Sequence, residues 1–356
     1  MFTVFRIASI AMRVTALVSA LTLCAPSLAD TGNYAVTNLV ADVPGVARTT
    51  DPNLVNGWGI ASLATSPIWV SSNGKGVSTL YNGLGTPVSP PSPVTIPSAN
   101  GTGHGVPTGI TSNPSANDFL LGATNARFLW STEDGAIAAW NGGSTATIKF
   151  VATDGAVYKG LALAANGSDF RLYAADFHNG KIDVLTSTFM PTTVAGGFQD
   201  PRIPAGFAPF NIMNLQGNLY VAYAKREQDG DDEVAGPGLG FVDVFDADGF
   251  LIDRVASRGK LNAPWGMAIA PAGFGKFSNH LLVGNFGDGT INAYDLKNFT
   301  FAGQLHTSNG RVLVIDGLWG IAFGNGFQHQ PTDTLFFAAG PNDESHGLYG
   351  KIEPAP

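Results

Sequence analysis

The sequence predicts an all-β protein, a six-bladed β-propeller with four-stranded antiparallel blades whose ring is closed by the N-terminal strand joining the last blade. Two observations carry this prediction. A unit of about 50 residues recurs along the chain, and each unit contains short alternating apolar segments bounded by Gly, Asn and Asp. Composition agrees, because 45 Gly, 22 Pro and 13% charged residues are typical of a protein with many turns.

Each unit opens with a similar segment: NGWGIA, VPTGIT, VYKGLA, FAPFNI, APWGMA and GLWGIA. We align these at Gly59, Gly109, Gly160, Phe210, Gly266 and Gly320, which are 50, 51, 50, 56 and 54 residues apart. A second segment follows in each unit: IWVSSNG, LLGATNA, LYAADFHNG, LYVAYAK, LLVGNFGDG and LFFAAGP. A third segment and a weaker fourth follow, and four strands in such a unit are typical of a propeller blade. Two stacked β-sandwiches would not explain these near-equal periods.

The ends of the repeat array predict how the ring closes. After Gly320 the last unit has three strands, whereas residues 34–42 precede the first unit and have no repeat of their own. We expect this leading segment to form the missing outer strand, which removes an exposed sheet edge. Within the first strands, Gly59, Gly266 and Gly320 are expected to permit close approach of neighbouring blades.

The N-terminus predicts export. Arg6 and Arg13 precede an apolar run over residues 14–25, and Ala29 is a small residue suited to cleavage. We therefore expect a signal peptide at residues 1–29, a single propeller domain at 30–356, and a periplasmic or secreted protein. Cys24 lies in the leader, so the mature chain would have no disulfide. The formal net charge is −8 and no basic cluster occurs, which disfavours nucleic acid and anionic membranes as partners.

Three longer segments carry a resemblance to known families: NLVADVPGVARTTDPNLVNGWGIA, APWGMAIAP and LWGIAFGNG. The chain resembles NHL-type six-bladed propellers over residues 33–354. It is also similar to a family of exported bacterial proteins of unknown function often found alongside PEP-CTERM-sorted proteins. This resemblance implies the fold and export, and it implies no particular chemistry. The chain ends in GKIEPAP without an apolar anchor, so we expect a released protein, and a monomer.

The candidate site is one mouth of the central channel. In antiparallel blades the first strand begins, and the second strand ends, at the same end of the ring. The residues expected to line this mouth and bind a ligand are Trp58, Asn73, His104, Asn125, Lys159, Asp176, His178, Tyr223, Trp265, Asn285, Trp319, Asn342 and His346. Flat Trp rings beside amides and a carboxylate suit a glycan, a small amphipathic molecule or a peptide. Alternatively, the three Trp side chains simply plug the channel.

Two function hypotheses follow. The first is an exported binding or scaffold propeller without catalysis, with its ligand at the Trp-lined mouth. The alternative is a calcium-dependent hydrolase resembling propeller lactonases and esterases, with Asp176, Asn285 and Asn73 as ligands of an axial Ca²⁺ ion. Those enzymes share an Asn before the first-strand Gly, and this chain lacks it. His104, His178 and His346 are a further candidate set for zinc or copper.

The longest irregular insertion, residues 225–240, is the last candidate. Its acidic core includes Asp229, Asp231 and Glu233, which are possible calcium ligands although they lack the spacing of an EF-hand loop. We also expect this glycine-rich loop to lie at the candidate mouth, where it is placed to act as a lid. A solvated acidic loop is the simpler interpretation.

Overall fold

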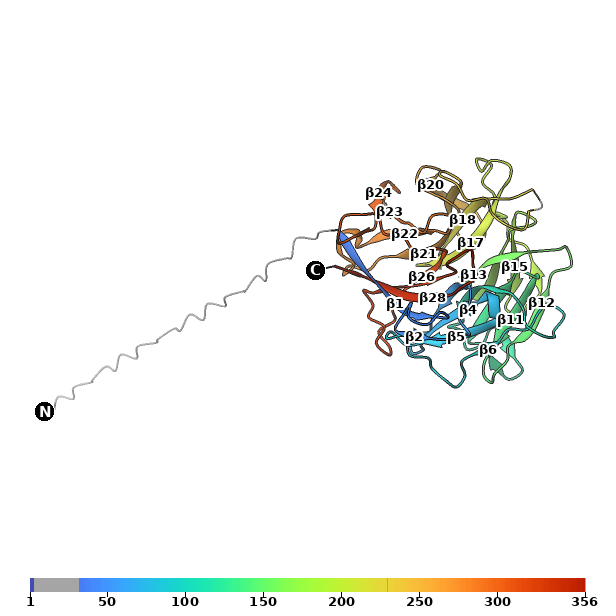
Figure 1. Cartoon of the computed structure of the whole chain (residues 1–356), viewed down its shortest axis with the longest axis horizontal. Helices are drawn as coiled ribbons and strands as arrows, with labels where there is room; N and C mark the ends of the chain where they lie inside the picture. The colour runs from blue at the N-terminus through green and yellow to red at the C-terminus, as the bar shows by residue number, and fades with distance from the viewer. Residues whose placement is uncertain (3–31, 229, 356) are drawn as a thin grey trace.

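The computed structural model describes residues 1–2, 32–228 and 230–355. It confirms the predicted six-bladed propeller of antiparallel blades, one sheet for each repeat (Figure 1). Apart from its first two residues, the predicted leader lies outside the described residues, as does Asp229. No helix in the described part of the chain has the length and apolar character needed to span a membrane.

In blades 1 to 5 the strands follow one another outward from the axis in chain order, whereas in blade 6 the N-terminal strand is outermost. Blade 1 contains β3 (Gly57–Ala61), β4 (Ile68–Ser72), β5 (Val77–Tyr81) and β6 (Val94–Thr95). Blade 2 contains β7 (Pro107–Ser112), β10 (Phe128–Thr132), β11 (Ala136–Trp140) and β12 (Thr147–Val151). Blade 3 contains β13 (Tyr158–Asn166), β14 (Asp169–Asp176), β15 (Lys181–Thr186) and β16 (Pro191–Thr192). Blade 4 contains β17 (Phe207–Leu215), β18 (Asn218–Lys225), β19 (Gly240–Phe245) and β20 (Leu251–Ser257).

Blade 5 contains β21 (Pro264–Ile269), β22 (His280–Asn285), β23 (Ile291–Asp295) and β24 (Phe301–Gln304). Blade 6 contains β26 (Leu318–Phe323), β27 (Leu335–Ala339) and β28 (Leu348–Pro354), completed by β1 (Asn33–Ala41), with the short β2 (Thr49–Thr50) and β25 (His306–Thr307) pairing with β1. A separate hairpin consists of β8 (Leu120–Leu121) and β9 (Thr124–Asn125), and two short 3₁₀ helices span Asn73–Lys75 and Gly275–Phe277.

Ring closure follows the prediction. β1 pairs antiparallel with β28 from Tyr34↔Pro354 to Ala41↔Leu348, and the two strands lie side by side in Figure 1, β1 in blue and β28 in red. The Tyr34 side chain is buried and its hydroxyl donates to the carbonyl oxygen of Phe274 at 3.0 Å, which ties the leading strand to blade 5. The N-terminal strand therefore belongs to blade 6 and also contacts its neighbour.

The first strands of neighbouring blades touch through their backbones. A Cβ atom on Gly59 would lie 2.7 Å from the carbonyl oxygen of Thr108 in blade 2, and one on Gly320 would lie 2.6 Å from that of Trp58 in blade 1. Real Cβ atoms do not approach so closely. Glycine is therefore required here for close packing of blades, as the sequence predicts for Gly59 and Gly320.

Two details of the sequence alignment are wrong. The second strand of blade 2 is β10, which directly precedes the turn at Glu133, whereas the segment around Asn125 forms the separate β8–β9 hairpin. In blade 4 the repeat is displaced by one residue, because Asn211 occupies the glycine position and Phe210 the position before it. A Cβ atom on Gly160 of blade 3 would lie 2.6 Å from the Cα atom of Asn211, as expected for the glycine position of the next blade.

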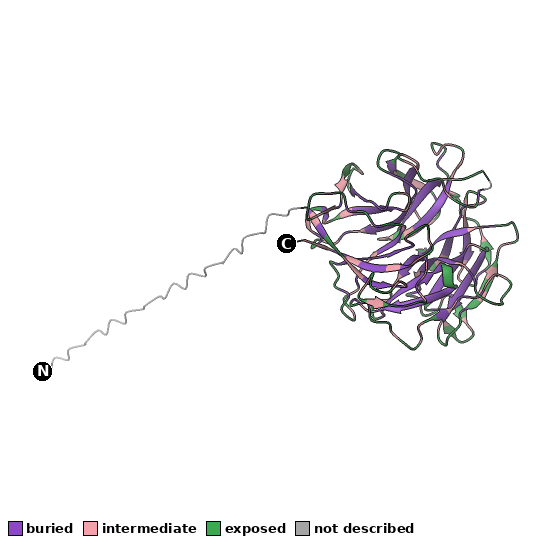
Figure 2. Ribbon diagram, in the orientation of Figure 1, coloured by how far each residue is buried: buried purple, intermediate pink, exposed green. Residues whose placement is uncertain are grey.

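Most of the core lies between adjacent blades and along the inner strands (Figure 2). Tyr223, expected at the channel mouth, belongs to this interblade core. Its ring is buried among apolar side chains of blades 3 and 4, and its hydroxyl has no partner among the described residues. Exposed residues concentrate in the loops at both ends of the ring (Figure 2).

The blade contact at Gly320 yields a stability prediction. Gly320→Ala should lower the free energy of unfolding by about 1–3 kcal/mol, because the added methyl group is forced against the backbone of blade 1. Gly142→Ala is the matched control, since a Cβ atom there meets nothing within 4 Å, and it should change stability by less than about 1 kcal/mol. Urea unfolding of both variants measures this. Equal stability of the two variants would contradict the blade-contact argument.

Candidate functional site

One residue of every first strand is directed to the axis by a recurring β-bulge. The register of the first two strands shifts at the same place in all six blades. The residues at this point are Trp58, Thr108, Lys159, Phe210, Trp265 and Trp319. A bulge leaves a residue outside the regular pairing and re-aims its side chain. These six side chains therefore meet at the centre of the ring, at the end where the first strands begin.

The three Trp residues form a solid plug. The rings of Trp58 and Trp319 stack with centroids 3.5 Å apart, and Trp265 packs edge-on at 5.9 Å from Trp58 and 5.6 Å from Trp319. Phe210 and Phe286 complete the cluster. All three Trp side chains are at most 3% exposed. Of the two alternatives that the sequence leaves open, a Trp wall and a Trp plug, the structure shows the plug, because the three rings pack against one another and are buried.

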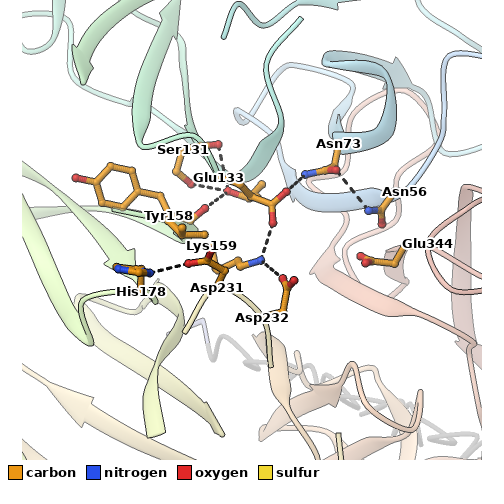
Figure 3. A network of polar contacts seen from close by, with 12 residues as sticks. Asn56, Asn73, Ser131, Glu133, Tyr158, Lys159, His178, Asp231, Asp232 and Glu344 are labelled. Carbon is orange, nitrogen blue, oxygen red and sulfur yellow. Dashed lines mark hydrogen bonds and ion pairs between the residues drawn. The ribbon is translucent and has the colours of Figure 1, made fainter. Parts of the chain in front are cut away.

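Lys159 is the charged member of this ring and lies directly on the plug. Its Nζ atom is 5.2 Å from the centroid of the Trp58 ring, 2.6 Å from Glu133 Oε1 and 3.1 Å from Asp232 Oδ1, and the residue is 1% exposed (Figure 3). Burial alone would lower the pKa of this ammonium, but Glu133 and Asp232 outweigh burial and raise it. Lys159 is therefore charged at any physiological pH.

Two further carboxylates lie close to Lys159 and lack a cation of their own. Burial raises the pKa of Glu233 to about 7, against the opposing attraction of Lys159. Burial also raises the pKa of Glu344, opposed by a hydrogen bond with Asn56, and its Oε1 accepts from Trp319 Nε1 at 3.2 Å. Among the described residues, no other side chain forms a hydrogen bond or ion pair with the Glu233 carboxylate, and its own backbone N–H opposes the rise in its pKa. The mouth thus carries more carboxylate than ammonium.

Amides extend the network toward blade 1. Asn73 Nδ2 donates to Glu133 Oε2 at 2.7 Å, and Asn56 Nδ2 lies 3.5 Å from Asn73 Oδ1 (Figure 3). Next to the network, Thr108 Oγ1 donates to the carbonyl oxygen of Tyr158 at 2.7 Å, which ties blade 2 to the residue before Lys159. The Lys159 backbone is therefore held between two blades.

The acidic insertion reaches this mouth, as the sequence predicts. It joins β18 to β19 in blade 4, yet it is fastened to blade 3: Asp231 Oδ1 is 2.6 Å from His178 Nδ1, and the Arg226 guanidinium donates to the carbonyl oxygen of His178. This attachment carries the next residue, Asp232, to Lys159 (Figure 3). The insertion thus lies across one side of the plug.

The side-chain oxygens of two expected axial calcium ligands, Asp176 and Asn285, accept hydrogen bonds from protein groups. Asp176 accepts hydrogen bonds from Asn179 and from the Val157 N–H, and Asn285 Oδ1 accepts from the Asn262 N–H at 3.1 Å. Within the ranges that the structure describes, no group of three or more His, Cys, Asp or Glu side chains is placed to hold a metal ion.

The remaining expected residues are dispersed. His346 Nδ1 pairs with Asp42 at 2.9 Å, the side chain of Asn342 donates to Ser345, and His104 is exposed on the loop between blades 1 and 2. Asn125 precedes β10 and so lies at the opposite end of blade 2. The structure therefore brings Asn73, Lys159 and Glu233 together with the three Trp residues. The other expected residues lie apart: Tyr223 in the interblade core, Asp176 and Asn285 at the ends of β14 and β22, and the rest in separate loops or in the β8–β9 hairpin.

Sequence reasoning missed four members of the mouth: Asn56, Glu133, Asp232 and Glu344. Glu133 was detectable, because STEDG directly precedes the third strand of its blade and the second strand must end just before it. Glu344 occupies the same kind of turn, in NDESHG before β28. The contact of Asp232 with Lys159 depends on how the insertion folds back onto blade 3, which no local pattern encodes.

Comparison with known proteins places the chain by sequence and by fold. No established protein-family profile matches the sequence. Among solved structures, the chain is similar to a streptogramin B lyase, with a TM-score of 0.53 at 13% identity over 91% of this chain and 98% of the other. It is also similar to a glucose dehydrogenase, with a TM-score of 0.53 at 15% identity over 90% of this chain and 100% of the other. At these identities the likeness concerns the fold alone.

Sequence comparison gives closer relatives. Two uncharacterised proteins of Acanthamoeba polyphaga mimivirus are each 31% identical to this chain, over 333 and 336 residues. The matches cover 90% of this chain in both cases, and 80% and 85% of the viral proteins. With such identity over most of both lengths, the chain belongs to the same family of six-bladed propellers as these uncharacterised mimivirus proteins.

Proposed function

We propose that the protein is a binding propeller without catalysis, whose acidic mouth above the Trp plug holds a positively charged group of its ligand, such as the primary amines of a basic peptide. The observation that carries this proposal is the excess of carboxylate around Lys159. Glu133 and Asp232 are paired with the Lys159 ammonium, whereas Glu233 and Glu344 are half-buried without a cation. A cation bound beside Glu233 would stabilise its ionised form.

The loops around the acidic mouth are also negatively charged. The loops that join second to third strands surround the mouth, and their described acidic residues outnumber the basic ones. The acidic residues are Glu133, Asp134, Glu227, Asp231, Asp232, Glu233, Asp288, Asp343 and Glu344, and the basic ones are Lys75 and Arg226. A mouth with one sign of charge raises the local concentration of an oppositely charged ligand and speeds its association.

The protonated state of Lys159 favours a binding function over catalysis. A lysine nucleophile needs a lowered pKa to supply the neutral amine, whereas the carboxylates here raise the pKa of Lys159. The calcium-dependent hydrolase hypothesis finds no support: the Asp176 carboxylate accepts from Asn179 in its own turn, and Asn285 Oδ1 accepts from the N–H of Asn262 in the loop between blades 4 and 5.

Export is part of the proposal, since the leader predicted at residues 1–29 has the order of a secretory signal. Expressed in a bacterial host, the full-length protein should appear in the periplasmic or extracellular fraction with Asp30 as its first residue. Fractionation followed by N-terminal sequencing measures this. An intact Met1 on soluble protein in the cytoplasm would contradict export.

The half-buried Glu233 predicts a pH-dependent stability. Its pKa is about 7 in the folded protein and 4.5 for a free side chain, so the folded state binds more protons between these values and stability falls as pH rises through this window. Glu233→Gln mimics the protonated side chain. The variant should be more stable than the native protein at pH 8 and equally stable at pH 4, by thermal unfolding. Glu227→Gln, an exposed change on the same loop, should show no such crossover.

Ligand binding is tested with a trilysine peptide amide. Isothermal titration should detect binding, and Trp emission should change because Trp319 Nε1 donates to Glu344 beside the site. Affinity should rise with pH through about 7 as Glu233 ionises. Glu233→Gln should weaken binding by about tenfold, equivalent to about 1.4 kcal/mol, whereas Glu227→Gln should leave it nearly unchanged.

The matched ligand control is the same peptide with every amine acetylated, which retains its size and loses its charge. It should not bind measurably. Equal binding of the acetylated peptide, or equal weakening by both Gln variants, would refute a charge-specific site at Glu233.

A further inference from the structure

The opposite end of the axis carries an uncharged cavity that lies apart from the acidic mouth. The first strands of the blades begin at the Trp plug and terminate at this opposite end. A cavity of about 360 Å³ lies among the ends of the first strands of blades 1, 2, 3, 4 and 6. Its walls include Ile60, Ile110, Leu161, Met213 and Ala322. Its volume falls within the usual range of small-molecule sites, about 300–1,000 Å³.

This cavity opens toward solvent and is closed on the axial side. A second hollow of about 290 Å³ extends it toward blade 5, and Met213 and Ala322 border both. Deeper along the axis, between Met213 and the underside of Trp265, the space narrows to about 20 Å³, enough for about one water molecule. The Trp plug then blocks the channel. The cavity is therefore a blind pocket separated from the acidic mouth.

The pocket lining is uncharged. No Asp, Glu, Lys, Arg or His side chain lines the larger cavity, and Ile60, Ile110 and Leu161 are at most 7% exposed at its deep end. Polar groups occur in the lining as the side chains of Ser62, Thr111, Ser112 and Asn214. The hydroxyls of Ser62 and Thr111 form no hydrogen bond with any described residue, so they remain available to a ligand.

We propose that this pocket binds a neutral, mainly apolar small molecule carrying one or two hydrogen-bonding groups. The apolar part would contact Ile60, Ile110 and Leu161, and the polar group would reach the hydroxyls of Ser62 or Thr111. A charged ligand is disfavoured, because its hydration would be lost without a counter-ion in the lining. This second site rests on the cavity and not on the acidic mouth, so either proposal can fail without the other.

The test compares two fluorescent probes that share a ring system. N-phenyl-1-naphthylamine is neutral, and 1-anilinonaphthalene-8-sulfonate adds a sulfonate to the same skeleton. The neutral probe should bind saturably at one site per chain with increased, blue-shifted emission, and the sulfonate probe should bind at least tenfold more weakly. Trilysine amide should not displace the neutral probe, because the Trp plug lies between the two sites.

Substitutions that fill the pocket test whether the probe binds there. Ala322→Phe fills the space shared by the two hollows and should weaken binding of the neutral probe at least tenfold. Ala302→Phe, the same change on the exposed outer strand β24, is the control and should not weaken it. Should thermal unfolding show that Ala322→Phe does not fold, Ala61→Phe on the neighbouring blade 1 is a second filling variant. Absence of saturable binding, equal affinity for both probes, or full binding by a folded filling variant would overturn the proposal.

Discussion

The structure depends on backbone contact between neighbouring blades at the inner strands. At Gly59 and Gly320 the first strand of one blade lies against the backbone of the next, with no room for a side chain between them. Asn211 takes this place in blade 4, where its amide donates to the carbonyl oxygen of Trp265 in blade 5 at 2.7 Å. Because the strands approach so closely, the residue before each contact leaves the regular pairing and points to the axis. The close approach of neighbouring blades thus determines both the packing of the ring and the position of the axial side chains.

The residue that each blade places on the axis determines the chemistry of the channel end where the first strands begin. Aromatic rings from Trp58, Trp265 and Trp319 pack against one another and exclude solvent. Blade 3 instead contributes Lys159, whose charge would be costly to bury without partners. Glu133 supplies one partner, and Asp232 from the acidic insertion supplies the other. The Lys159 side chain is buried whereas that of Asp232 is 69% exposed, so Glu133 is the better-shielded partner and Asp232 is a solvent-screened tether for the insertion.

Much of the fold was predictable from the sequence, because the repeat fixes the number of blades and the unpaired segment at residues 34–42 fixes how the ring closes. The site was less predictable. A Trp at the start of three first strands fits an open wall or a closed plug equally well, since the choice depends on how far each bulge turns the ring inward. Glu133 was missed because LLGATNA resembles a strand, although the true β10 lies just after it. Phe210 was misplaced by one residue because Asn211 replaces the expected glycine.

The recurring bulge also has an evolutionary consequence. Each axial side chain belongs to a different blade and lies outside the regular pairing of its sheet, so strand pairing does not fix its identity. A propeller of this type carries six such exchangeable positions around one centre, held here by Trp58, Thr108, Lys159, Phe210, Trp265 and Trp319. Relatives with the same ring can therefore differ in what fills the axis, from a packed aromatic plug to a buried charge with its partners, through these six positions.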